Sequence, residues 1–133
     1  MILLSYKDLE TQAKEVLTAI GTLFQCPLAE EADVVEAQAK EIEAWYSNVL
    51  YLLPIAEKYY RKEQAKLLES YKKEAVSKGL KGTDYEKEIY INDKASEYRE
   101  LRDMMENMAK AIGQRISLAQ SIIKKGKSNE LSQ

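Results

Sequence analysis

The sequence predicts an all-α fold: a long antiparallel helical hairpin, kinked at Pro54, with a shorter N-terminal helix packed on its base as in a three-helix bundle. Three observations lead to this prediction. Apolar residues recur at helical spacing in three segments of the chain. Among 133 residues there are only five glycines and two prolines, so few positions interrupt a helix. The apolar fraction of 45% and the charged fraction of 32% fit one domain of exposed amphipathic helices.

The first predicted helix spans about residues 5–26. Ser5 is a suitable N-cap because its hydroxyl can accept a hydrogen bond from a backbone N–H of the first turn, and Asp8 follows three residues later. Pro27 ends the helix. The apolar positions of this segment are Leu9, Ala13, Val16, Leu17, Ile20, Leu23 and Phe24.

The second predicted helix spans about residues 29–78. Acidic residues at its start suit the positive end of a helix dipole. Pro54 lacks an N–H and pushes away the carbonyl of Leu50, so we expect a kink rather than a break. The apolar positions, which step by three, four or seven, are Val35, Ile42, Trp45, Val49, Leu52 and Ala56.

The third predicted helix spans about residues 84–125 and follows a turn that contains Gly79 and Gly82. Thr83 and Glu86 have the spacing of a capping box. The apolar positions leave a strict heptad after residue 112, which favours bundle packing over an extended coiled coil. They are Ile91, Ala95, Tyr98, Leu101, Met105, Met108, Ile112, Ile116, Ala119 and Ile123. Residues 1–125 are thus expected to form a single helical domain, and residues 126–133 a disordered tail.

The second helix is expected to extend well beyond the first. At 1.5 Å per residue its roughly fifty residues would reach about 75 Å. The first helix can therefore cover only the part of the hairpin near the chain termini. The part near the turn at 79–82 is left with two helices, and its exposed apolar edge predicts self-association or a protein partner.

Charge alternates in sign along the chain. Residues 1–57 have a net charge of −7, residues 58–83 of +5, residues 84–107 of −4 and residues 108–133 of +4. In an antiparallel hairpin the blocks of opposite sign would lie against each other and fix the register. This arrangement explains the basic segment without a nucleic-acid ligand, and the overall net charge of −2 argues against binding through bulk charge.

A nucleic-acid role remains the alternative for the basic segment. A helical wheel places Tyr59 with the lysines on a solvated face and Tyr60 on the opposite, core face. Tyrosines beside lysines can stack on bases while the lysines neutralise phosphates. The candidate residues for binding single-stranded nucleic acid or a partner are Tyr59, Arg61, Lys62, Lys66, Lys72, Lys73, Lys78 and Lys81.

The sequence offers little for catalysis. It has no histidine, which removes the commonest general base, the Cys/His zinc patterns and the helical di-iron motif. Cys26 precedes a proline and has no candidate base, so we interpret it as a packed or half-exposed thiol. Carboxylate pairs such as Glu86 and Glu88 are interpreted as solvated acids. We therefore expect no enzyme activity, no cofactor and no metal.

The compartment expected from the sequence is the cytoplasm. A single cysteine cannot form an internal disulfide, and the N-terminal residues lack the apolar run of a signal peptide. The longest apolar run, Val49 to Ala56, is eight residues and too short to span a membrane. No membrane association is expected.

The C-terminal third, "SEYRELRDMMENMAKAIGQRISLAQSIIK", resembles the last helix of small helical bacteriophage proteins. Genes for such proteins often lie near those for single-strand DNA recombination. The resemblance covers about thirty of the 133 residues and carries no catalytic residues. It implies a phage or prophage origin, a place in the host cytoplasm and an accessory role with contact to a recombinase, single-stranded DNA or a host protein.

Two functional hypotheses follow. The first is a non-enzymatic, self-associating adaptor or inhibitor whose partner is a protein. The second is a recombination or replication accessory protein that binds nucleic acid through the basic segment. An enzyme is the third and least favoured class, because no set of residues in the sequence supplies a reaction.

Overall fold

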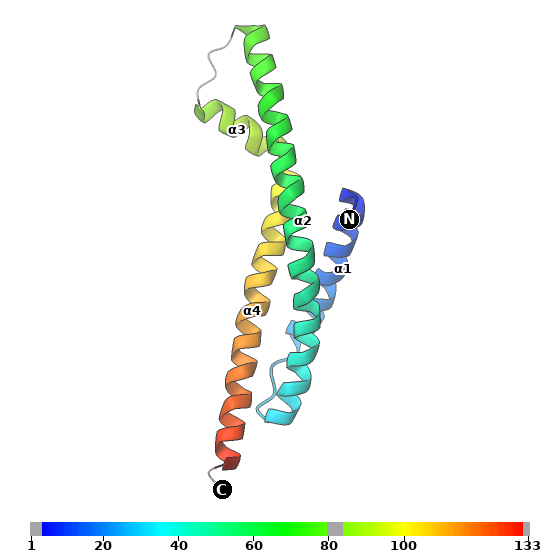
Figure 1. Cartoon of the computed structure of the whole chain (residues 1–133), viewed down its shortest axis with the longest axis vertical. Helices are drawn as coiled ribbons and strands as arrows, with labels where there is room; N and C mark the ends of the chain where they lie inside the picture. Colours follow the sequence, from blue (N-terminus) through cyan, green and yellow to red (C-terminus); the bar gives the residue numbers. More distant parts are fainter. Residues whose placement is uncertain (1–3, 80–83, 132–133) are drawn as a thin grey trace.

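The computed structural model describes residues 4–79 and 84–131, and it confirms the all-α fold. The described residues form four helices in the order α1 (Tyr6–Gln25), α2 (Ala32–Lys78), α3 (Asp84–Lys94) and α4 (Ser96–Leu131). Figure 1 shows α2 and α4 as the two long antiparallel elements, with α1 beside the lower part of α2. The predicted hairpin with a shorter N-terminal helix on its base is therefore correct.

Helix α1 forms as its sequence predicts. Ser5 is the N-cap, and its hydroxyl accepts a hydrogen bond of 3.2 Å from the backbone N–H of Asp8. Cys26, in extended conformation, caps the other end. Of the predicted apolar face, Leu23 and Phe24 are partly buried, and Leu17 is 42% exposed. The buried residues are Leu9, Ala13, Val16 and Ile20.

Helix α2 begins at Ala32, three residues later than predicted, because a side chain holds the preceding backbone. The Gln38 amide accepts a hydrogen bond from the Ala29 N–H at 3.0 Å and donates one to the Pro27 carbonyl at 3.3 Å. These bonds satisfy polar groups that a longer helix would have used. The helix then continues through Pro54, and Figure 1 shows it as one gently bent ribbon. It ends at Lys78 and is capped by Gly79, whose φ of 64° suits a residue without a Cβ.

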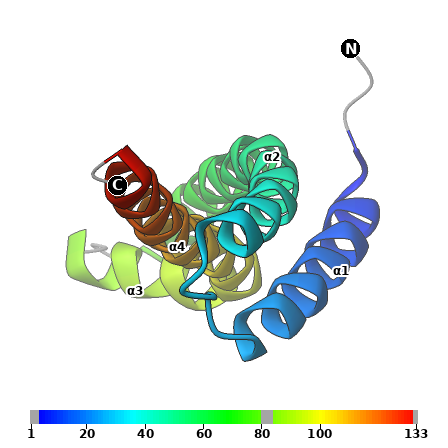
Figure 2. The same cartoon turned by 90° about the horizontal axis from the view of Figure 1, so that it is seen from below.

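The third predicted helix is in fact two helices, α3 and α4, which meet at Ala95. The prediction of a single helix over 84–125 is wrong at this point because the chain changes direction there without proline or glycine. Backbone bonds from Ala95 to Ile91 (2.9 Å) and from Arg99 to Ala95 (3.0 Å) persist across the bend. The residues just before it, Asn92 and Asp93, are weak helix formers. The bend carries α3 out to the side of the bundle (Figure 2).

The prediction of a disordered tail over 126–133 is also wrong, since α4 continues to Leu131 and residues 132–133 lie outside the described ranges. The reason is a close contact at Gly126. A Cβ built on Gly126 would lie 2.7 Å from the Cβ of Ala32, so the absence of a side chain lets α4 pass close to the start of α2. The glycine is a packing residue here and does not end the helix.

The core lies in the basal half, which we define as α1, α2 up to Tyr60, and α4. Figure 2 shows α2 and α4 nearly along their axes, with α1 lying obliquely beside α2. A small second cluster of Val35, Ala39 and Ala119 joins the start of α2 to the C-terminal part of α4. The buried residues of the main cluster are Leu9, Ala13, Val16, Ile20, Ile42, Val49, Leu52, Ala56, Leu101, Met105, Met108 and Ile112.

Candidate functional site

The end of the hairpin away from the chain termini has no buried core. We call this region the distal arm and define it as residues 61–77 of α2 together with α3. Tyr60 is the last buried residue of α2, and Ala95 is the first buried residue after the turn. No side chain described in 61–77 or 86–94 is buried. Figure 1 shows why: α1 begins beside the middle of α2 and runs towards the base, and only α3 lies near the upper part.

The distal arm nevertheless carries apolar and aromatic side chains in a pattern that continues the core face. Leu67, Leu68 and Tyr71 of α2 are half-buried, as is Tyr90 of α3. The rings of Tyr71 and Tyr90 pack with their centroids 5.3 Å apart. Val76, at 83% exposed, has almost no protein around it. The arm is therefore an incomplete helical layer with room for further helix contacts.

Three tyrosines mark the boundary between the basal half and the distal arm. The ring of Tyr6 in α1 lies 5.6 Å from that of Tyr59 in α2 and 4.5 Å from that of Tyr98 in α4. The Tyr59 hydroxyl donates a hydrogen bond to the Leu4 carbonyl. Burial, together with the charges of Glu97 and Glu10, raises the pKa of Tyr6 to about 12. The cluster fixes the start of α1 onto the hairpin at the end of the core.

Arg102 of α4 lies at the same level and joins α4 to α2. Its guanidinium lies 4.6 Å from the centre of the Tyr60 ring, 2.8 Å from Asp103 and 3.5 Å from Glu57. Burial lowers the pKa of Arg102, but Asp103 and Glu57 outweigh it and raise the pKa above its ordinary value. The cation is thus permanently charged and holds the two long helices in register.

The predicted basic residues are mostly found where the sequence placed them, on an exposed face of α2. Arg61 and Lys73 form ion pairs within the helix with Glu57 and Glu69, at 3.0 Å and 3.6 Å. By contrast, some of the lysines make no ion pair with any residue that the structure describes. These exposed lysines are Lys58, Lys62, Lys66 and Lys72. Lys78 ends α2, its side chain is outside the described set, and Lys81 lies outside the described ranges.

Tyr59 lies at the edge of this exposed face and is only partly exposed. The start of α1 covers one side of it, because its ring packs against that of Tyr6. Its hydroxyl is already hydrogen-bonded to the Leu4 carbonyl. Its remaining surface lines a small pocket with Ile55, Lys58 and Lys62. The tyrosine and two lysines thus share one surface, with less of the ring exposed than a helical wheel predicts.

The alternating charge blocks make fewer contacts between helices than the sequence led us to expect. Lys14 with Glu10 and Lys110 with Glu106 are four residues apart on a single helix. The Arg102–Glu57 pair does connect α2 with α4. Exposed pairs spaced by four residues add only about 0.3–0.5 kcal/mol each. Apolar packing thus contributes much more than these ion pairs to the arrangement of the hairpin.

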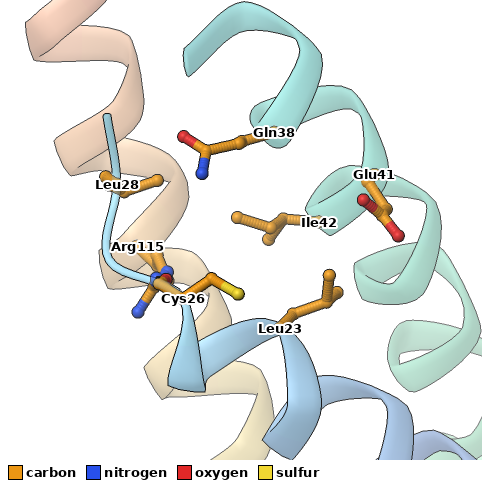
Figure 3. Close-up of a pocket in the computed structure, with 7 residues that line it drawn as sticks. All are labelled: Leu23, Cys26, Leu28, Gln38, Glu41, Ile42 and Arg115. Carbon is orange, nitrogen blue, oxygen red and sulfur yellow. The ribbon is translucent and has the colours of Figure 1, made fainter. Parts of the chain in front are cut away.

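A small cavity lies at the base, between the end of α1, the first turns of α2 and α4 (Figure 3). Its volume of about 150 Å³ is below the roughly 300–1,000 Å³ of typical ligand sites. Both an acidic and a basic side chain line it, so neither sign of charge dominates. The lining residues are Leu23, Cys26, Leu28, Gln38, Glu41, Ile42 and Arg115.

The contacts of Arg115 at this cavity hold helices together. Its guanidinium donates a hydrogen bond to the Cys26 carbonyl and lies 4.8 Å from the centre of the Phe24 ring. Its Nε is buried and has no hydrogen-bond partner in the described part of the chain. The side chain thus fixes the end of α1 against α4. The Cys26 thiol is exposed, and Glu41 is the acidic residue that lines the same cavity.

The described residues hold neither a cluster of metal-ligating side chains nor a membrane-spanning helix. They contain no group of three or more His, Cys, Asp or Glu side chains that could hold a metal ion. None of the described helices has both the length and the apolar character needed to cross a bilayer. No protein-family model, curated protein or solved structure matches the chain. The candidate sites are therefore surfaces: the distal arm and the exposed face of α2.

Sequence reasoning missed the roles of three residues. Tyr6, Arg102 and Arg115 each connect two helices, yet none of them lies in the predicted apolar positions. For the two arginines, the available signal was their position next to an apolar stripe. Such a residue can place its long stem over the core and its charge on a neighbouring helix.

Proposed function

We propose that the protein is a non-enzymatic binding protein, an adaptor or inhibitor, which uses the distal arm to engage a helix of a protein partner. The observation that carries this proposal is the end of the core at Tyr60 and Ala95, while α2 continues to Lys78. An amphipathic helix laid against this face would bury apolar residues at helical spacing. Self-association is one way to supply that helix.

The chemistry of the arm defines the partner. Its apolar residues Leu67, Leu68 and Tyr71 would receive leucine-like or aromatic side chains. The flanking lysines, including Lys66 and Lys72, would favour acidic residues at the rim. The partner is therefore expected to present an amphipathic helix with an acidic polar face.

The test is a quantitative pull-down from cells of the source organism, with three forms of the protein as bait. These are wild type, the double variant Leu67→Ser/Leu68→Ser and the control Glu69→Gln. Because the two leucines are only half-buried, the double variant should remain folded by circular dichroism. A partner should be retained by wild type and the control and lost by the double variant. Identical sets for all three baits would contradict the proposal.

Nucleic-acid binding is the second candidate, supported by one observation. The exposed lysines Lys58, Lys62, Lys66 and Lys72 are not neutralised by any described residue and could contact phosphates. The packing of Tyr59 against α1 weakens this candidate, because it covers part of the ring that would stack on a base. We rank it below protein binding for that reason.

Salt-dependent binding to labelled single strands separates the two candidates. If Lys62, Lys66 and Lys73 contact phosphates, changing all three to glutamine should reduce the magnitude of the salt slope by about two, at roughly 0.7 per contact. We expect instead little wild-type binding at physiological salt. Micromolar or tighter binding that the triple variant loses would place nucleic-acid binding first.

The phage or prophage origin implied by the C-terminal third stays a prediction. Under that hypothesis the partner would be a recombination protein or a host protein that meets one. Adding a purified single-strand annealing recombinase to the same binding assay tests it directly. Binding that depends on Leu67 and Leu68 would support the accessory role.

A further inference from the structure

Halfway along α2, apolar side chains lie on the surface away from the core. Leu50 is 47% exposed and Tyr51 is 58% exposed, and Pro54, one turn further, is also exposed. No other described helix covers them. We call these three residues the α2 patch. The leucine and the tyrosine form a small exposed apolar patch, and tyrosine is enriched in protein interfaces.

The segments of α2 on the two sides of the α2 patch carry net charges of opposite sign. Residues 44–56 contain no charged side chain. The preceding segment, 30–43, holds six acidic residues and one base, Lys40, whereas the following segment, 57–73, holds six bases and three acids. One helix therefore has an acidic arm, a neutral apolar centre and a basic arm.

The charged residues nearest the α2 patch lie on its own face of the helix. Glu36, Glu43, Leu50, Pro54 and Lys58 follow one another at intervals of four or seven residues, which places them in one row. The charged members of this row are all exposed. None of them forms an ion pair with a residue that the structure describes. Their charges are thus available to a second molecule.

We propose that the α2 patch is a homodimer interface, in which a second copy of the chain docks antiparallel so that each acidic arm faces the basic arm of the other. The proposal follows from complementarity. In a dimer with two-fold symmetry, each contact occurs twice. If one residue of the first copy contacts a second residue of the partner, that second residue of the first copy contacts the first residue of the partner. The antiparallel arrangement places opposite charges together at both ends. A parallel arrangement would place acid against acid and base against base, which disfavours it.

The bend of α2 determines the geometry of the contact. A helix bends away from its proline, so the face that carries Pro54 is convex. Two convex faces touch at their centres, which makes the α2 patch the crossing point. Charges within a few turns, such as Glu43 and Lys58, then lie close enough to set the orientation. This interface rests on the proposed role in binding, and it is separate from the distal arm.

The test reverses the charge of one arm in each of two variants. The mass of each protein is measured by sedimentation at several protein concentrations. The first variant is Lys58→Glu/Lys62→Glu and the second is Glu36→Lys/Glu43→Lys. Each variant alone places like charges together and should raise the dissociation constant of the dimer about tenfold or more at low salt. Mixed in equal amounts, the two should form a heterodimer with wild-type affinity, because opposite charges then meet at both ends.

A second pair of variants tests the apolar centre. Tyr51→Glu should abolish the dimer, while Leu118→Glu, which changes an equally exposed apolar residue of α4, should not. Both residues are exposed, so circular dichroism should show the same helix content for both variants.

Three results would overturn the proposal: a wild-type protein that is monomeric at every concentration, a dimer that tolerates Tyr51→Glu, and a mixture of charge variants that remains monomeric. The last two, found together with normal pull-down through the distal arm, would reject this interface and leave the proposed binding function intact. Identical pull-down sets for all three baits, with an intact dimer at the α2 patch, would reject the proposed function alone. Binding of single strands by a monomer would assign the basic arm to nucleic acid.

Discussion

The basal half and the distal arm share helix α2 and differ in the helices that pack against it. In the basal half, α2 is packed by α1 and α4 and buries Val49, Leu52 and Ala56 almost completely. In the distal arm, the same apolar repeat continues through Leu67 and Tyr71, which are only half-buried. The apolar repeat of α2 therefore defines one face of the helix, and packing by a third helix buries that face in a core.

This difference separates stability from function in the molecule. A fully buried leucine contributes about 1.5–3 kcal/mol relative to an exposed one, so the basal half supplies most of the folding free energy. The distal arm contributes less and is expected to open at lower cost than the base. Its apolar side chains are therefore available for binding.

The largest expected effect comes from the same substitution in the two regions. Leu52→Ala removes a side chain that is 1% exposed and should cost about 2–5 kcal/mol. Leu67→Ala changes a half-buried residue of the same helix and should cost about 1 kcal/mol or less. Urea unfolding of both variants measures the two costs. Equal costs would mean that the distal arm is packed in solution, for example by self-association, and would require the comparison to be repeated at higher dilution.

The second prediction concerns the end of the basal half. Gly126→Ala places a Cβ 2.7 Å from that of Ala32 and should destabilise the protein by about 1–2 kcal/mol, because overpacking outweighs the gain in helix propensity. Gly21→Ala is the matched control in α1. A Cβ at Gly21 meets no atom within 4 Å, so this variant should gain about 0.5–1 kcal/mol. Thermal unfolding that showed stabilisation by both variants would restore the predicted frayed tail.

The third prediction concerns Pro54, which lies between the two regions. Pro54→Ala returns an N–H donor to the carbonyl of Leu50 and should straighten α2. We expect stability to rise by about 1 kcal/mol, measured by thermal unfolding, with helix content unchanged or slightly higher. Lost self-association at unchanged helix content would instead show that the bend serves binding.

Much of this fold could be predicted from the sequence, because helix identity depends on local periodicity. The predicted stripes of α1, α2 and α4 are largely buried, and Ser5 caps α1 as expected. The bend at Ala95 could not be predicted, since no proline or glycine marks it. The extent of α4 was missed because Gly126 looked like a helix end. Only the position of Ala32 on a neighbouring helix explains that glycine.

The candidate site was predicted less completely, and Tyr59 shows why. A helical wheel correctly separates Tyr59 from Tyr60, but it cannot tell which side of α2 a second helix covers. In the structure α1 reaches as far as Tyr59 and buries half of it, while Lys62, one turn further, remains exposed. Exposure of the lysines was predictable from charge. The covering of the tyrosine depended on where α1 begins.

The smallest expected effect tests the boundary between the two regions through pH. The pKa of Tyr6 is raised to about 12 in the folded protein, from an ordinary value of 10.0. The folded state therefore holds the proton more tightly than the unfolded state. Stability from this group is fully present below pH 10 and is lost as the pH rises from 10 towards 12.

Tyr6→Phe should remove part of this alkaline loss, since phenylalanine keeps the ring contacts with Tyr59 and Tyr98 but cannot ionise. Urea unfolding at pH 8 and at about pH 11 measures the difference between the two stabilities, which should be smaller in the variant than in wild type. Tyr98, whose pKa is also raised by burial, leaves a residual loss. An equal alkaline loss in Tyr6→Phe and wild type would show that the start of α1 separates from the hairpin before the tyrosine ionises.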